Sequence, residues 1–192
     1  MKNLGTQYEV RELIDESIIL NYIFFSKRSD NEVTVVKLIQ YAPFLHPNGK
    51  LAFFDGKLIY NMGFGDYDPV TKRTNDATLT GNKDTYKVFN TVLGTVPMFF
   101  EKNPAIGVMV QGSDSKPEFE EECKKNCQKQ CLDSCRKINQ RINIYCKYVS
   151  KNLETLSSDY QFVGGVKNDL EWFDFENFIP YKEYDTVIVY KK

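Results

Sequence analysis

The chain has 192 residues, with 25 Lys and Arg against 26 Asp and Glu, so its net charge is −1. This length supports one domain with a hydrophobic core, and the balanced charge carries no general signature of polyanion binding. The N-terminal segment lacks the apolar stretch of a secretory signal, and no apolar run approaches the roughly 20 residues of a membrane span. We therefore expect a cytoplasmic protein with reduced thiols and no contact with a membrane.

The first hundred residues of the chain contain segments rich in β-branched and aromatic residues, which favour strands. Segments 17–26 and 33–41 flank a polar turn and predict a hairpin. Asp55-Gly56 is a signal for a two-residue turn, and it predicts a second hairpin between 51–54 and 57–62.

The middle of the chain predicts a helix that is capped by Gly81 or Asn82, ends at Lys102 and is kinked at Pro97. The apolar run 105–110 predicts a buried strand. Later strands are expected at 161–163, 171–178 and 185–190, with a turn at Gly164-Gly165 after the first of them.

Residues 116–156 contain no Gly, and no Pro after residue 117, and their apolar residues repeat with a helical period. They predict one long amphipathic helix of about 60 Å, at 1.5 Å of rise per residue. The fold class that we predict is therefore α+β, with a mostly antiparallel sheet of about five to seven strands, one kinked helix and one long amphipathic helix.

Four of the five cysteines are spaced four residues apart on this predicted helix, at Cys123, Cys127, Cys131 and Cys135. On a helical wheel they join an apolar stripe, which favours burial of reduced thiols in a core. One continuous helix cannot gather four thiolates around a metal, whereas two copies of the chain could do so. We expect no cofactor, and a zinc site at these cysteines is the alternative.

The segment 61–66 (NMGFGD) ends a predicted strand with two glycines and a carboxylate. Such glycines allow either a tight bend or the close approach of a ligand, and a bend is the more common reason. The candidate binding residues here are Asn61, Gly63, Gly65, Asp66 and Asp68. Asp66, Asp68 and Asp76 could also hold a cation, although their spacing is not that of an EF-hand.

Arg141 and Tyr145 are i, i+4 neighbours on the predicted long helix, and they complete the candidate binding residues. An Arg beside a Tyr can hold a phosphate or a carboxylate, although it is more often a structural pair. Lysines on the opposite helix face could meet nucleic acid, but a solvated face is the more common meaning of such a stripe.

Five short motifs together resemble an uncharacterised family, a domain of unknown function in short proteins mainly from Bacteroidota with an N-[LM]-G-F-G-D motif. They are NMGFGD (61–66), NKD (82–84), EKNP (101–104), VQGS (110–113) and R-x3-Y (141–145), and the resemblance extends over roughly residues 50–192. In that family the G-S segment is followed almost at once by R-x-R-L-Y. Here Gly112-Ser113 and Arg141 are far apart in the sequence, and Asn143 replaces the inner Arg.

We predict a single α+β domain, residues 1–192, and the resemblance implies that a Cys-containing helical insertion at about 115–140 is not part of the machinery that the family shares. The resemblance implies no activity. Members of the family look like small accessory genes, and an accessory, toxin–antitoxin or defence role is expected on that basis alone. From the residues we predict a non-enzymatic binding protein that self-associates or holds a partner protein through the long helix, and the resemblance implies that it is bacterial. The alternatives are an enzyme or nucleic-acid-acting toxin with a site near Asp66, Asp68, Arg141 and Tyr145, and a metal-binding protein.

Overall fold

The computed structural model describes residues 5–13, 18–27, 34–75, 82, 84–115, 117–125, 138–169 and 172–192. The chain divides into two compact units, unit 1 (Met1–Val108) and unit 2 (Met109–Lys192), and each is described by itself. Within the described residues, no helix has both the length and the apolar character needed to cross a bilayer.

Unit 1 is built on an antiparallel sheet with the strand order β1-β2-β3-β5. Its main strands are β1 (Arg11–Leu13), β2 (Leu20–Lys27), β3 (Thr34–Pro43) and β5 (Lys57–Asp68). Two short strands, β4 (Phe53–Phe54) and β6 (Arg73–Asn75), pair with opposite ends of β5.

Both predicted hairpins of unit 1 are confirmed. β2 pairs antiparallel with β3, and β4 pairs antiparallel with β5 across the turn at Asp55-Gly56. Asp55 and Gly56 have φ values of 49° and 72°, the left-handed region that a type I′ hairpin turn requires at both positions.

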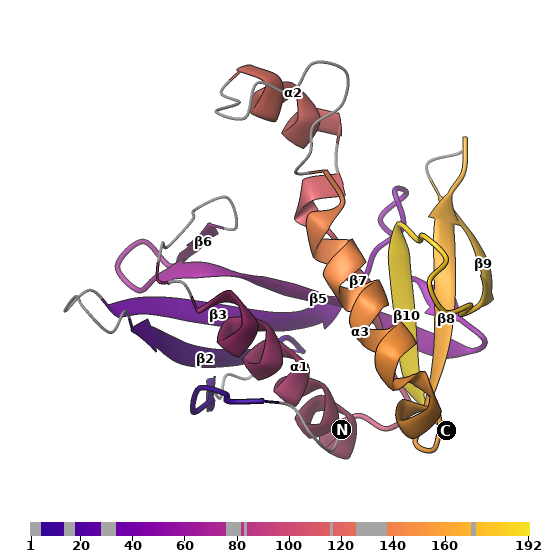
Figure 1. Ribbon diagram of the computed structural model, residues 1–192, viewed down its shortest axis with the longest axis horizontal. Coiled ribbons are helices and arrows are strands. Elements are labelled where there is room, and N and C mark those ends of the chain that lie inside the picture. Colours follow the sequence, from indigo (N-terminus) through magenta and orange to yellow (C-terminus); the bar gives the residue numbers. More distant parts are fainter. Residues whose placement is uncertain are drawn as a thin grey trace. The chain divides into compact units, whose positions relative to one another are not determined.

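Helix α1 (Thr85–Lys102) packs on one face of this sheet and contains Pro97, and Figure 1 shows it lying across β2 and β3. The Tyr41 and Phe99 rings stack with centroids 4.4 Å apart. The Tyr41 hydroxyl lies 2.8 Å from the hydroxyl of Thr95, so a polar tip is satisfied inside an aromatic core.

The residue that caps α1 is Asp84, so the prediction of a cap at Gly81 or Asn82 is wrong. The Asp84 side chain makes no capping hydrogen bond to the helix. It binds side chains from two other segments instead, which leaves the local sequence with no signal for the helix start.

Unit 2 contains three antiparallel strands in the order β10-β8-β9, namely β8 (Tyr160–Lys167), β9 (Phe173–Asn177) and β10 (Thr186–Lys191). The buried strand β7 (Gly107–Gln111) and the 3-10 turn η1 (Ser113–Ser115) precede helix α2 (Pro117–Lys125). Helix α3 (Gln140–Leu156) lies beside β10 (Figure 1) and buries one stripe of side chains, Ile142, Cys146, Val149 and Leu156.

The predicted fold class is wrong. The described residues form ten strands of a mixed sheet and three short α-helices, of 18, 9 and 17 residues. A continuous helix over 116–156 is excluded because Asn139 has a φ of 58°, which no α-helix contains. The Asn139 N–H donates to the Asp114 carbonyl at 3.3 Å, so a tertiary contact fixes the start of α3 where the apolar period continues unbroken.

The predicted turn at Gly164-Gly165 is also wrong, because β8 runs straight through both glycines. A Cβ at Gly164 would lie 2.2 Å from the Tyr184 ring, and one at Gly165 would lie 2.6 Å from Thr186. These glycines make room for side chains that cross the sheet, which is the other reason for glycine inside a strand.

Candidate functional site

The NMGFGD segment does not leave the sheet as a bend or bulge, because β5 continues through it to Asp68. Strand alternation divides the motif between the two faces of the sheet. Met62, Phe64 and Asp66 share the face that packs on α1, and Asn61, Gly63 and Gly65 share the opposite face.

The two glycines of the motif have different surroundings. A Cβ at Gly65 would lie 2.7 Å from Thr74 Cγ2 and 2.9 Å from the Asn75 carbonyl oxygen, so glycine is needed where β6 approaches β5. A Cβ at Gly63 would meet nothing closer than 3.9 Å. Packing among the described residues therefore explains Gly65 and leaves Gly63 unexplained.

We expect Gly65→Ala to destabilise unit 1 by about 1–3 kcal/mol, because the new methyl group meets backbone that cannot move without breaking the β5–β6 pairing. Gly63→Ala, two residues away on the same strand, is the matched control and should change stability by less than about 0.5 kcal/mol. Hydrogen exchange of the β5 and β6 amides measures both. Equal effects of the two substitutions would contradict this assignment.

Asp66 forms an ion pair with Lys37, a partner from the neighbouring strand β3. Their side chains are only 17% and 6% exposed, so both charges are largely removed from water. The Lys37 ammonium also lies 5.7 Å from the centroid of the Phe64 ring, a cation–π distance. This pair neutralises Asp66 at the point where the motif ends.

A second polar cluster lies on the same face of the sheet, around Asp84. The Asp84 carboxylate accepts hydrogen bonds from the Tyr8 hydroxyl at 2.8 Å and from the Ser26 hydroxyl at 2.6 Å. Asn82 Nδ2 donates to the Ser26 oxygen at 2.7 Å. Burial, and after it the hydrogen bond to Asp84, raises the pKa of Tyr8. Ser26 is fully buried, so this cluster joins three chain segments and gives a substrate no access to a nucleophile.

A pocket of about 490 Å³ opens at the end of β5, where β6 begins. It is lined by residues of β5, β6 and the turn between them, Asp66, Tyr67, Asp68, Thr71, Arg73, Thr74 and Asn75. In the strand register Asp66 faces Asn75 and Asp68 faces Arg73, so these four polar side chains stand on the α1 face of the sheet. Tyr67 and Thr74, the other strand residues that line the pocket, pair with each other on the opposite face.

Asp68 is committed to its own turn. Its carboxylate accepts hydrogen bonds from the Val70 and Thr71 backbone N–H groups, at 2.8 and 3.3 Å, and from the Thr71 hydroxyl at 2.8 Å. These bonds, led by the one from the Thr71 side chain, lower the pKa of Asp68. Asp68 thus has a structural role that the sequence did not reveal.

The second predicted group, Arg141 and Tyr145, lies on α3 in unit 2, whereas Asn61 to Asp68 lie in unit 1. A site shared by the two groups stays a prediction. Within unit 2, Arg141 Nη1 donates to Ser113 Oγ. Burial raises the pKa of Tyr145 to about 12, although the positive charge of Arg141 opposes this shift.

Residues 113–114 and 139–141 meet although a long segment separates them in the sequence. Besides the Arg141–Ser113 bond, the Arg141 N–H donates to Asp114 Oδ2 at 3.0 Å. Ser113 and Asp114 thus lie beside the start of α3 within unit 2. The domain organisation predicted for the whole chain, with an insertion at about 115–140, stays a prediction.

Most of the predicted metal ligands fall outside the described residues, namely Asp76, Cys127, Cys131 and Cys135. Of the four predicted cysteine ligands, the structure describes Cys123, on α2. In the part of the chain that the structure describes, no three His, Cys, Asp or Glu side chains form a group that could hold a metal ion. The fifth cysteine, Cys146, lies in the core stripe of α3, and burial raises the pKa of its thiol to about 11.

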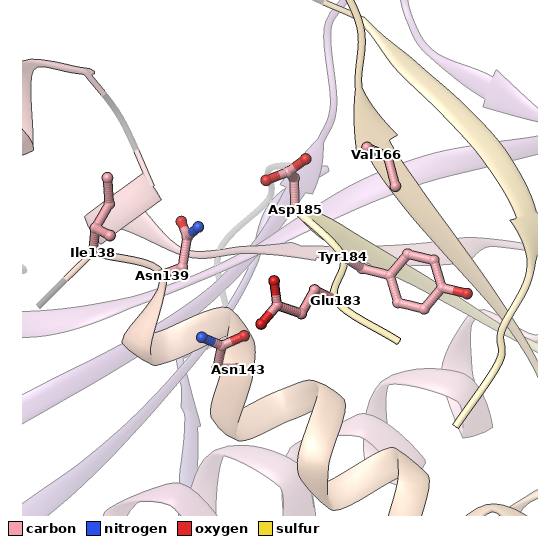
Figure 2. A pocket seen from close by; sticks show the side chains of 7 residues that line it. All are labelled: Ile138, Asn139, Asn143, Val166, Glu183, Tyr184 and Asp185. Atoms are coloured by element: carbon pink, nitrogen blue, oxygen red, sulfur yellow. The ribbon is translucent and has the colours of Figure 1, made fainter. Parts of the chain in front are cut away.

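Unit 2 has a pocket of its own, of about 390 Å³, between the start of α3 and the segment before β10. Figure 2 shows the side chains of Asn139, Asn143 and Glu183 close to one another in it, with the Tyr184 ring turned away. Asp185 accepts a hydrogen bond from the Lys167 N–H at 2.8 Å. The pocket includes neither Arg141 nor Tyr145.

Sequence reasoning missed several residues of the pocket and of the polar clusters beside it, among them Tyr8, Ser26, Lys37 and Arg73. Lys37 interrupts the apolar run of β3 on its buried face, and a charge at an inward position was a usable signal. The other three carry no local pattern, because only the pairing of distant strands brings them to this face.

Unit 1 is thus a small two-layer fold, in which helix α1 covers one face of an antiparallel sheet and a polar pocket lies where β5 ends and β6 begins. The chain belongs to DUF6934, a family of unknown function, whose model matches residues 6–118. The match includes all of β2 and β3, which the resemblance seen in the sequence left out, and it ends before α3. No curated protein and no solved structure matches the chain.

Proposed function

We propose that this protein is a non-catalytic binding protein, and that unit 1 holds a small polar ligand in the pocket between β5 and β6. The observation that carries the proposal is the pocket itself, about 490 Å³ of space at the end of the NMGFGD strand. Its size suits a metabolite rather than a protein segment. It also lies within the part of the chain that the family model matches.

The state of the carboxylates supports binding rather than catalysis. Asp66 is paired with Lys37, and Asp68 is held by three hydrogen bonds within its turn. A general base needs a carboxylate that can reach and accept a substrate proton. Both carboxylates are already bound to groups of the protein itself. The pocket can therefore hold a ligand by its shape and its fixed polar groups, without a free base.

Self-association or a partner protein was expected because of a long amphipathic helix, and the structure replaces that helix with α2 and α3. Binding of a small ligand in the β5–β6 pocket depends only on described residues of unit 1. It is therefore the better-supported form of a binding function.

The test is a thermal-unfolding screen of the full chain against amino acids, dicarboxylates, sugar phosphates, nucleotides and polyols. A ligand that binds only the folded state raises the melting temperature. We expect at least one compound to do so, and we expect Asn75→Trp to abolish the effect because the indole fills the pocket from β6. Thr34→Trp, at an exposed position at the start of β3, is the control and should keep it.

A screen without a hit would count against the proposal, as would a hit that Asn75→Trp leaves unchanged. The melting temperature of each variant without compound shows whether the indole itself disturbs the fold.

A further inference from the structure

We infer that the ligand of the β5–β6 pocket carries an oxyanion, a carboxylate or a phosphate, and that the Arg73 guanidinium recognises it. This inference rests on the proposed function, because it names the chemistry of the ligand in the same pocket. Among the described residues that line the pocket, Arg73 is the only one with a cationic side chain.

The argument begins with the cross-strand neighbour of Arg73. Asp68 stands directly opposite it in the β5–β6 register, where oppositely charged side chains usually pair. Here the Asp68 carboxylate turns to the Val70 and Thr71 N–H groups and to the Thr71 hydroxyl. No ion pair joins it to Arg73 within the described residues.

The other carboxylate of the pocket is also unavailable to Arg73. Asp66 is paired with Lys37, which approaches it from β3. Among the residues that the structure places, nothing binds the Arg73 guanidinium, although two carboxylates line the same pocket. A guanidinium presents a planar fork of donors that matches a carboxylate or a phosphate in a bidentate way.

The charges around the pocket fit a ligand that is anionic at one end. Lys37 balances Asp66, and Asp68 stays ionised because hydrogen bonds lower its pKa. The ligand's oxyanion would pair with Arg73, while Asp68 and Asn75 line the rest of the pocket. Lys72, next in the chain, is exposed and does not line the pocket.

The experiment is an NMR titration of the ¹⁵N-labelled full chain with inorganic phosphate, with succinate and with succinamide, its neutral analogue. We expect phosphate or succinate to shift the amides of residues 66–75, and succinamide to bind at least about tenfold more weakly. Arg73→Gln should weaken binding of the anion by at least about tenfold, and Arg73→Lys should restore only part of it. Lys72→Gln removes the same charge one residue away and should leave binding unchanged.

The outcomes separate the two proposals. If Lys72→Gln weakens binding as much as Arg73→Gln does, the effect is general electrostatics and the inference fails. The inference also fails, while the proposed function stands, if neutral compounds bind this pocket and both anions do not. If nothing tested binds there, both fail. A response to phosphate alone or to succinate alone identifies which oxyanion the pocket takes.

Discussion

Replacing Lys37 by Met is expected to lower the free energy of unfolding of unit 1 by about 3–5 kcal/mol. The substitution keeps an apolar stem of similar length, and it removes the Lys37 ammonium that pairs with the largely buried Asp66 carboxylate. The cost therefore arises from a carboxylate left without a partner, rather than from lost packing. Hydrogen exchange of the β3 and β5 amides reports this loss without interference from unit 2.

The double variant Lys37→Met, Asp66→Leu separates the two causes. A buried ion pair can be replaced by apolar side chains of similar size at little cost, so we expect the double variant to recover most of the stability. Lys50→Met removes a lysine from an exposed loop of the same unit and should change stability by less than about 0.5 kcal/mol. A double variant as unstable as Lys37→Met would show that the lysine acts through packing.

Gly164→Ala should destabilise unit 2 by about 3–5 kcal/mol, through overpacking and the loss of two hydrogen bonds. The new Cβ would lie 2.2 Å from the Tyr184 ring, which is held in place at its hydroxyl. That hydroxyl accepts from the Ile179 N–H at 3.0 Å and donates to Glu176 at 2.9 Å. The ring cannot move aside without breaking both bonds.

Urea unfolding followed by tryptophan fluorescence measures this effect, because Trp172, the single Trp of the chain, lies in unit 2 and packs on Phe173 and Phe175. Val166→Ala, on the same strand, is the control and should cost less than about 1 kcal/mol. Adding Tyr184→Ala to Gly164→Ala should cost less than the sum of the single changes, since it removes the clash. Strict additivity would contradict the proposed contact.

The sequence predicted local structure well where turn chemistry decides it. Asp55-Gly56 adopts the backbone that its residue types favour, and the hairpin forms around it. The apolar run at 105–110 is also confirmed, since β7 is buried. Both signals are complete within a few residues, and the pairing of the described strands agrees with them.

The errors arise where distant contacts decide the structure. Gly164-Gly165 has the composition of a turn, but the rings that cross β8 require its glycines. The apolar period over 116–156 is continuous in sequence, yet Asp114 fixes a left-handed residue at Asn139, immediately before α3. Neither Tyr184 nor Asp114 can be identified as a neighbour from local sequence.

The candidate site was predicted in part. Asp66 and Asp68 line the pocket, but their hydrogen-bond partners were not foreseen, and these partners change what the carboxylates can do. Arg73 was not among the predicted site residues. Its role in the pocket depends on the strand register, which places Arg73 opposite Asp68, whose carboxylate is bound to Thr71.

The most direct test of the account is to map the binding site of the strongest hit from the ligand screen by NMR on the full chain. We predict that the largest amide shifts fall on residues 66–75, with smaller shifts at Lys37, and that they follow one binding curve. Shifts centred instead on Asn139, Asn143 and Glu183, or scattered over both units, would contradict a ligand site between β5 and β6.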